Sequence, residues 1–424
     1  MESRRVMIIS QVLPVLRYYL SNRIFVQRLL VIRQYFSSHT YAKGSIDTDF
    51  TMSASRILVI DPTMPAPDRD AGSRHIWDIL QFLTTRGFSV WFVPANLSVR
   101  EPYKSQLQGI GVNVLSFPQI WSVSRYLRRY QSHFDAIILS RYPVAWKYMQ
   151  QAVLAKLPGQ QIIFNTEDLQ HLRLSREAVT TGNNLLRRYA TRVMHHELQL
   201  TSQADHTLVV SEVEQNMLND TFPTKDITLL PLTISVVEKI PPWRIRNGIF
   251  FVGGFRHYPN VDGLHYFLRE VWPIIRRLSD TITLRVVGTP IPHFKDVSLH
   301  GVVFLGNVKS MEPLLETTRI SIAPLRFGAG LKGKVLESLS YGVPVVGTPV
   351  AAEGFEPINE SGIIIADTSE DMAHSIVRLY RDEELWNRHS EQSLRYVRSH
   401  FSDTIHDDLS RVVRPEKRKT PGAK

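Results

Sequence analysis

The sequence of 424 residues contains no cysteine. This absence excludes disulfide bonds, a thiolate nucleophile, iron–sulfur clusters and cysteine-ligated zinc, and it favours a reducing compartment, the cytoplasm. The chain also lacks an apolar run of the roughly 18 residues that a membrane-spanning helix needs. Its most apolar stretch is interrupted by arginines, namely Arg17, Arg23, Arg28 and Arg33. We therefore expect no transmembrane helix.

Acidic residues are fewer than basic ones, since 50 Lys and Arg against 40 Asp and Glu give a formal net charge of +10. Such a surplus favours anionic partners such as nucleotides, phospholipid surfaces or nucleic acid. Residues 3–46 have no acidic side chain at all. We expect residues 1–55 to form a basic amphipathic or disordered extension that either packs on the main body or lies on an anionic membrane. Residues 414–424 predict a disordered basic tail.

From Arg56 onward, short apolar runs alternate with stretches of helical periodicity such as Leu185–Gln203. The alternation predicts a parallel sheet with helices on both of its faces. The predicted strands are Ile57–Ile60, Val90–Val93, Ala136–Leu139, Gln161–Phe164, His206–Val210 and Ile227–Leu230.

The segment Ile240–Asn247, with two consecutive prolines, breaks this rhythm and predicts a linker. A second array follows it, and the chain is helical again from Ser369 to about Ser399. We predict an α/β protein of two doubly wound, Rossmann-like domains, residues 56–239 and 248–399, facing a cleft where the strands end. The second domain has predicted helices at Val261–Leu278 and Gly330–Tyr341, and predicted strands at Ile249–Val252, Thr283–Val287, Val302–Leu305, Ile320–Pro324, Val343–Val346 and Ile363–Ile365.

The densest functional signal is a glycine-rich turn between a predicted strand and a predicted helix, within Ala323–Glu337. Gly328 and Gly330 allow close backbone approach to an anion, and the N–H groups of the helix start face the turn. Lys332 and Lys334 add two cations. Glu337, one turn after Lys334, is placed to accept hydrogen bonds from ribose hydroxyls. The segment predicts a diphosphate site; the alternative is a plain helix start with a solvated Lys334–Glu337 pair.

The same turn also fits the dinucleotide fingerprint G-x-G-x-x-G, through Gly328, Gly330 and Gly333. That fingerprint normally opens the first strand–helix–strand unit of its domain, whereas several predicted strands precede it here. Two lysines within the turn also suit a more exposed diphosphate than that of NAD. An NAD(P)-dependent oxidoreductase is therefore the alternative function.

Two further loops follow predicted strands. Phe250–Asn260 places Gly253, Gly254 and Arg256 after one strand, and Pro62–Arg74 places Gly72 just before a helix. Either loop alone is commonly an ordinary strand-to-helix turn. Three such loops at strand ends in two domains favour a ligand site.

Together these motifs resemble the group 1 glycosyltransferases, a large retaining nucleotide-sugar family with the two-domain GT-B architecture. The resemblance spans about Arg56 to Ser399. It implies that Glu337 holds the ribose, that Arg256 binds the diphosphate with Lys332 or Lys334, and that Gly72 approaches the reacting phosphate. It also implies a donor chiefly in the second domain and an acceptor in the first. The residues that carry it are Ile57–Asp61, Gly72, Val209–Glu212, Val252–Gly254, Gly328–Glu337 and Tyr341–Val346.

Two positions depart from the pattern of that family. The family usually has a second Glu eight positions before the ribose Glu, where this chain has Ala329. Many members also carry a His after the strand that corresponds to Ile162–Phe164, where this chain reads Asn165–His171. Glu167, Asp168 and His171 are candidates to orient the donor or acceptor, and we select Asp168. The alternative is that Asp168 caps the following helix.

Three other patterns are set aside. Asp47–Asp49 and Asp68–Asp70 read D-x-D, the manganese motif of glycosyltransferases with a different fold, but they lie in the extension and in the first loop. The adjacent His195 and His196 point to different sides of a helix, so a shared metal is not expected. The tryptophans are scattered rather than arranged as a stacking platform, so we expect no nucleic-acid binding.

We therefore predict a metal-independent, retaining glycosyltransferase of the hexosyltransferase type, with no cofactor beyond its nucleoside-diphosphate sugar. Its expected partners are that donor and a glycan or glycolipid acceptor in polysaccharide or glycolipid assembly. Its expected location is the cytoplasm, with peripheral membrane contact through residues 3–46. Besides the oxidoreductase, a non-catalytic module that binds a nucleotide sugar or a membrane is the second alternative.

Overall fold

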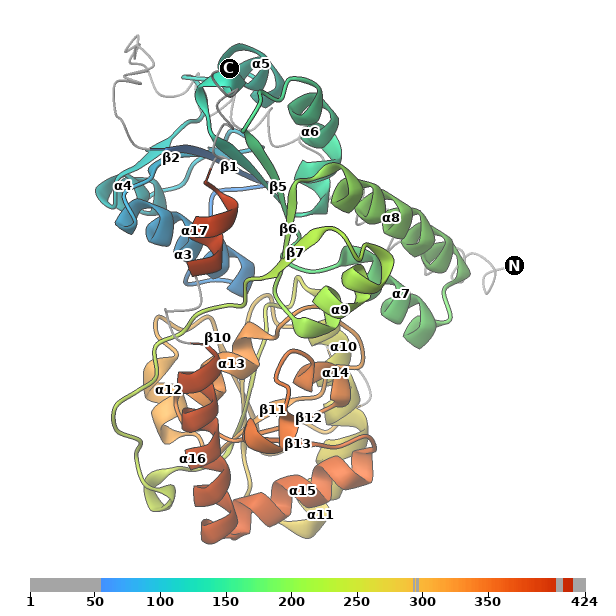
Figure 1. Cartoon of the computed structure of the whole chain (residues 1–424). Helices are drawn as coiled ribbons and strands as arrows, with labels where there is room; N and C mark the ends of the chain where they lie inside the picture. The colour runs from blue at the N-terminus through green and yellow to red at the C-terminus, as the bar shows by residue number, and fades with distance from the viewer. Residues whose placement is uncertain (1–54, 293, 295–296, 402–406, 415–424) are drawn as a thin grey trace, which may run out of the picture. The chain divides into compact units, whose positions relative to one another are not determined.

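The computed structural model describes residues 55–292, 294, 297–401 and 407–414. Two compact units share them: unit 1 takes 55–230 and 407–414, and unit 2 takes 231–401 (Figure 1). The predicted extension and basic tail lie almost entirely outside the described residues. No helix in the described part of the chain is both long and apolar enough to cross a membrane.

Unit 1 is built on a seven-stranded sheet of order β3-β2-β1-β4-β5-β6-β7, in which every pairing is parallel. Its strands are β1 (Arg56–Asp61), β2 (Ser89–Pro94), β3 (Val112–Val114), β4 (Ala136–Ser140), β5 (Gln161–Asn165), β6 (His206–Val209) and β7 (Asp226–Leu229). Its helices are α3 (Ala71–Thr85), α4 (Tyr103–Gly109), α5 (Val123–Tyr130), α6 (Tyr142–Leu154), α7 (Gln170–Thr181), α8 (Asn184–Gln203), α9 (Glu212–Thr221) and α17 (Asp407–Val412), with a 3-10 turn at Gln131–His133.

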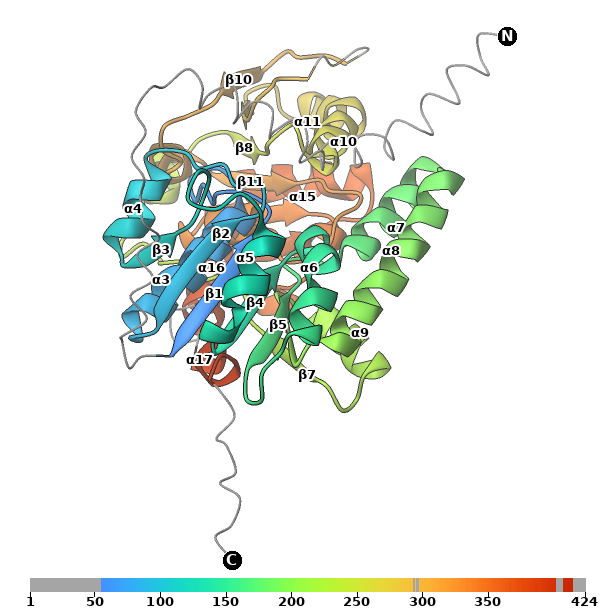
Figure 2. The same ribbon diagram turned by 90° about the horizontal axis from the view of Figure 1, so that it is seen from above.

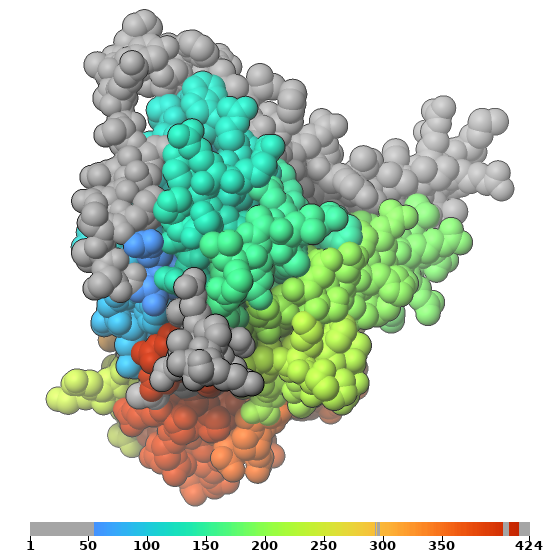
Figure 3. Space-filling model, turned by 45° about the horizontal axis from the view of Figure 1, so that its top comes forward, coloured from blue at the N-terminus to red at the C-terminus, as the bar shows by residue number. Residues whose placement is uncertain are grey.

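The strands of unit 1 are buried on both faces because alternate residues point to opposite sides of the sheet. In β1, Leu58 and Ile60 join a core with α5, α6, α7 and α8, whereas Ile57 and Val59 join a core with α3, α4 and α17 (Figure 2). In the space-filling view the green residues of unit 1 form one continuous area of the face that is shown (Figure 3). This double burial explains why the strands read as unbroken apolar runs.

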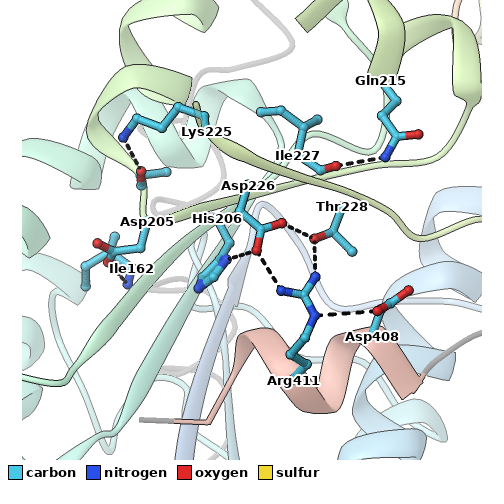
Figure 4. A network of polar contacts seen from close by, with 11 residues as sticks. Ile162, Asp205, His206, Gln215, Lys225, Asp226, Ile227, Thr228, Asp408 and Arg411 are labelled. Atoms are coloured by element: carbon cyan, nitrogen blue, oxygen red, sulfur yellow. Dashed lines mark hydrogen bonds and ion pairs between the residues drawn. The ribbon is translucent and has the colours of Figure 1, made fainter. Parts of the chain in front are cut away.

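The last described helix, α17, belongs to unit 1 although it follows the helices of unit 2 in the chain. Leu409, Val412 and Val413 are buried in the unit 1 core. Arg411 donates from Nη1 to Asp226 Oδ2 at 2.7 Å, on β7 (Figure 4). This return of the chain to unit 1 lies beyond Ser399, where the predicted second domain ends, and it was not predicted.

Unit 2 is built on a six-stranded parallel sheet of order β10-β9-β8-β11-β12-β13. Its strands are β8 (Ile249–Val252), β9 (Leu284–Val287), β10 (Val302–Gly306), β11 (Ile320–Ala323), β12 (Val345–Gly347) and β13 (Ile363–Ile365). Its helices are α10 (Tyr258–Tyr266), α11 (Trp272–Leu278), α12 (Glu312–Thr317), α13 (Gly333–Ser340), α14 (Pro349–Ala352), α15 (Ser369–Arg381) and α16 (Glu383–His400). A π turn at Phe267–Val271 joins α10 to α11, and 3-10 turns lie at Trp243–Ile245 and Ile358–Glu360.

The segment predicted as a linker, Ile240–Asn247, is attached to unit 2, and the division between the units falls at Leu230. The attachment comes from Arg246, whose side chain is fully buried. Its guanidinium lies 5.2 Å from the centre of the Trp386 ring. It donates hydrogen bonds of 2.9–3.0 Å to the carbonyl oxygens of Pro241, Leu315, Thr318 and Tyr341.

The predicted fold class, two doubly wound parallel α/β domains, is confirmed. The predicted strands coincide with observed strands to within two residues. Among the strands of the described residues, only β3 was not predicted, because an asparagine interrupts its short apolar run, Val-Asn-Val.

Candidate functional site

The glycine-rich turn of unit 2 joins β11 to α13, as predicted. Gly330 has a φ of +65°, in the region that favours glycine. Lys332 precedes the helix in an extended conformation, with φ −88° and ψ 91°. Its carbonyl oxygen accepts from the backbone N–H groups of Val335 and Leu336, at 2.8 and 3.1 Å. Regular helix therefore begins at Gly333, three residues later than predicted.

The two lysines of this turn have different surroundings. Lys334 donates to Glu337 Oε2 at 2.9 Å, and both side chains are partly exposed. Lys332 is only 10% exposed; its Nζ donates to the carbonyl oxygen of Gly330 and lies 3.8 Å from Glu353 Oε2. Lys334 and Glu337 thus lie on one side of α13. Lys332, which is extended and precedes the helix, points toward Glu353 instead.

The segment after β8 lies against the glycine-rich turn, because β8 and β11 are adjacent strands. Arg326 of the turn is bound by Asp262 of α10 through two hydrogen bonds, one of them 2.8 Å from Nε to Oδ2. A Cβ on Gly263 would come within 2.7 Å of the Pro324 carbonyl oxygen. The middle of α10 is therefore in close contact with the residues that follow β11.

Gly253, Gly254 and Arg256 follow β8 at this edge of the sheet. A Cβ on Gly253 would meet the Asn260 side chain at 2.8 Å, while Gly254 has open space around it. Arg256 is exposed. The structure thus brings the segment of Arg256 and the Lys332–Glu337 segment to the carboxyl edge of one sheet, where ligands of such sheets bind.

In unit 1, the three candidates after β5 have separate surroundings. Asp168 forms an ion pair with Arg173, 3.2 Å from Oδ2 to Nη1, and does not cap α7. His171 is buried, with its Nδ1 2.6 Å from Glu197 Oε2, and Glu197 also accepts from the backbone N–H groups of Gln170 and His171. Glu197 therefore accepts the hydrogen bonds of the first backbone N–H groups of α7, and the His171 side chain contacts the same carboxylate.

Glu167 instead lies in a buried polar cluster. Its Oε1 is 3.0 Å from His75 Nδ1 and accepts from Asn165 Nδ2 at 3.1 Å. Beside it, Arg141 donates from Nε to Asp61 Oδ1 at 3.0 Å. Gly72 lies against this guanidinium, since a Cβ there would come within 2.8 Å of Arg141 Nη2.

Burial and charge shift the pKa values of this cluster. Burial raises the pKa of Asp61 to about 6, although Arg141 opposes the shift. Burial also acts to raise the pKa of Glu167, but His75, Arg141 and Asn165 together hold it below its ordinary value. Burial acts to lower the pKa of Arg141, yet Asp61, Glu167 and Asp70 keep that pKa above its ordinary value. Arg141 and Glu167 are thus charged near neutral pH.

The D-x-D pair in the first loop is occupied by structural contacts. Asp68 accepts from the Tyr103 hydroxyl at 2.6 Å. Asp70 caps α3 by accepting from Ser73 N and Ser73 Oγ, at 2.7 and 2.8 Å. Both carboxylates therefore accept hydrogen bonds from side chains or backbone of unit 1.

Three residues that contact predicted site residues or candidates were not predicted from the sequence. They are Arg141 beside Gly72, His75 beside Glu167, and Glu353 near Lys332. Arg141 comes two residues after the predicted strand Ala136–Leu139, so its position near a strand end was an available signal. His75 and Glu353 carry no such signal, because each is brought to its partner by tertiary packing between distant segments.

Comparisons with known proteins bear on the family and on the fold. Residues 246–382, most of unit 2, match the sequence model of a family described as Glycosyl transferases group 1. The match covers the Arg256 segment and the whole of Gly328–Glu337, so the resemblance drawn from those residues is confirmed over this range. No curated protein sequence matches the chain.

Solved structures are similar over both units. Sucrose-phosphate synthase from Thermosynechococcus elongatus is 13% identical, with a TM-score of 0.63, over 84% of this chain and 98% of the other. WaaG, a glycosyltransferase involved in lipopolysaccharide biosynthesis, is 13% identical with a TM-score of 0.58, over 84% and 99%. HepE from Anabaena, in complex with UDP-glucose, is 14% identical with a TM-score of 0.58, over 84% and 99%. The fold is therefore that of the GT-B glycosyltransferases, as predicted.

Proposed function

We propose that this protein is a retaining, metal-independent glycosyltransferase that moves a sugar from a nucleoside diphosphate to an acceptor hydroxyl. The observation that carries the proposal is the strand-end site of unit 2. There the Gly330 turn, the extended Lys332 and the Lys334–Glu337 pair of α13 adjoin the segment of Arg256. The family match over the same residues supports it.

In this proposal each predicted site residue has a role. Glu337 accepts hydrogen bonds from the ribose hydroxyls. Arg256, Lys332 and Lys334 bind the diphosphate, and Gly253, Gly254, Gly328 and Gly330 let the backbone approach it. In unit 1, Gly72 lies near the reacting phosphate, and Asp168 orients the donor or acceptor.

The chemistry then comes from positioning and from charge. The bond between the sugar C1 and the diphosphate oxygen breaks, a bond from C1 to the acceptor oxygen forms, and the acceptor proton leaves with the diphosphate. Cations and helix N–H groups that face the departing oxygens stabilise the charge that develops on them, without rearranging during the reaction. Arginine and lysine thereby fill the part that a divalent metal plays elsewhere.

Two of the similar structures guide the choice of substrate. HepE has been solved with UDP-glucose, and WaaG is described as acting in lipopolysaccharide biosynthesis. We propose by analogy a UDP-sugar as the first donor to test, and a glycan or glycolipid acceptor in polysaccharide or glycolipid assembly. The protein would act in the cytoplasm, with membrane contact through residues 3–46.

The position of the turn argues against the oxidoreductase alternative. In chain order β11 is the fourth strand of unit 2, after β8, β9 and β10. A dinucleotide fingerprint normally lies between the first strand of its domain and the following helix.

A thermal-shift panel tests the proposal. The full chain is heated with UDP, GDP, ADP, NAD or NADP, each with and without EDTA. We expect one nucleoside diphosphate to raise the Tm equally in both conditions. Stabilisation by NAD or NADP alone would contradict the transferase, and a Tm shift lost in EDTA would contradict metal independence.

A further inference from the structure

Three neighbouring strands of unit 1 end in charged residues that the proposed reaction has not used. Asp61 is the last residue of β1, Arg141 directly follows β4, and Glu167 comes two residues after β5. Because the sheet order is β1-β4-β5 and the strands are parallel, all three lie at the same carboxyl edge. This edge is where ligands of doubly wound sheets bind.

The backbone at this edge adopts conformations that non-glycine residues rarely occupy. Arg141 has a φ of +68° and Glu167 a φ of +64°. Such conformations cost free energy and persist where the surroundings enforce them, most often at functional sites. Here Arg141 and Glu167 follow two adjacent strands, β4 and β5, and belong to the same buried polar cluster.

Arg141 is the member of the cluster that a ligand can reach. Its side chain is 32% exposed, whereas those of Asp61, Glu167 and His75 are at most 8% exposed. Asp61 holds the guanidinium at Nε, and the missing side chain at Gly72 leaves room for its Nη end. A fixed guanidinium of this kind offers hydrogen-bond donors in a defined direction.

The charges around Arg141 select the kind of ligand. Asp61, Glu167 and Asp70 all act on this one cation. Hydroxyl groups both donate and accept hydrogen bonds, so they match a guanidinium that lies beside carboxylates.

We propose that Arg141 hydrogen-bonds the hydroxyl groups of an uncharged glycosyl unit of the acceptor, and that Asp61 and Glu167 position it to do so. This inference rests on the proposed function, since a glycosyl ligand is what a glycosyltransferase acts on. Arg141 is then a substrate-contacting residue, and Asp61 and Glu167 are positioning residues.

The test uses an array of neutral and uronic-acid-containing oligosaccharides, probed with the full-length protein. The variants are Arg141→Ala and Gly72→Ala, singly and together. The added methyl group of Gly72→Ala must displace the guanidinium without removing it, so this variant carries the test if Arg141→Ala does not fold. Arg128→Ala, which removes an exposed arginine of α5, is the matched control. The Tm shift with UDP, GDP and ADP is recorded for every variant.

We expect the wild type and Arg128→Ala to retain neutral glycans, and both single variants to bind them at least tenfold more weakly. The double variant should bind no more weakly than Arg141→Ala, because both changes remove the same contact. The inference would be overturned if the single variants bound neutral glycans as strongly as the wild type does. It would also be overturned if the wild type bound only acidic glycans, or no glycan. The nucleotide Tm shift separates the two claims: if no nucleotide stabilises the wild type, the proposed function itself fails.

Discussion

Replacing Glu337 by alanine tests the ribose site of α13. The variant removes one charged hydrogen-bond acceptor, which contributes about 1.5–3 kcal/mol to binding. At about 1.4 kcal/mol per tenfold change, the dissociation constant of the nucleotide should rise about 10- to 150-fold. The Lys334–Glu337 pair is 38% and 25% exposed, so its loss should cost the fold no more than about 1 kcal/mol. A domain of this size then loses at most about 4 °C in Tm.

Isothermal titration with the nucleotide that gives the largest Tm shift measures the effect directly. Glu391→Ala, which removes an exposed glutamate of α16, is the control and should bind as the wild type does. Unchanged affinity in a folded Glu337→Ala variant would refute the ribose assignment. The pair with Lys334 would then be a solvated helix-surface contact.

Three further predictions concern stability and pH. Arg246→Met leaves four carbonyl oxygens without their donor and should lower the free energy of unfolding of unit 2 by about 4 kcal/mol in a urea titration, whereas a loss below about 1 kcal/mol would show that the contacts are dispensable. Leu409→Ala should destabilise unit 1 by about 2–4 kcal/mol, because Leu409 is fully buried; no change would mean that α17 does not pack there in solution. Since burial raises the pKa of Asp61 to about 6, kcat/KM for the acceptor should rise with pH through about 6, as the carboxylate that holds Arg141 forms beside Glu167 and Asp70. Asp61→Asn should abolish this rise of kcat/KM with pH. It should also abolish a pH dependence of the free energy of unfolding: the raised pKa of Asp61 stabilises the fold below about pH 4, and this contribution is lost as the pH rises through about 6.

The sequence predicted the fold well because buried parallel strands leave continuous apolar runs, as at Ile249–Val252. It also predicted the strand, glycine turn and helix of Gly328–Glu337, since those signals are local. It did not predict the attachment of α17 to unit 1 or the buried Arg246, because both depend on contacts between distant segments. The sequence also could not tell apart the surroundings of Glu167 and Asp168, because neighbouring carboxylates look alike in sequence. Only packing places Glu167 beside His75 and Arg141, while Asp168 pairs with Arg173.

The most direct test of the central claim is the steady-state turnover of Lys332→Ala and Lys334→Ala with the sugar nucleotide that the wild type accepts. Lys332 lies before the helix beside Glu353, and Lys334 lies on the helix beside Glu337, so the two variants should differ. At least one should lower kcat/KM by about 100-fold or more, the effect of removing a fixed charge from developing negative charge. If both variants retain near-normal turnover, the glycine-rich turn is not the diphosphate site and the proposed function loses its main support.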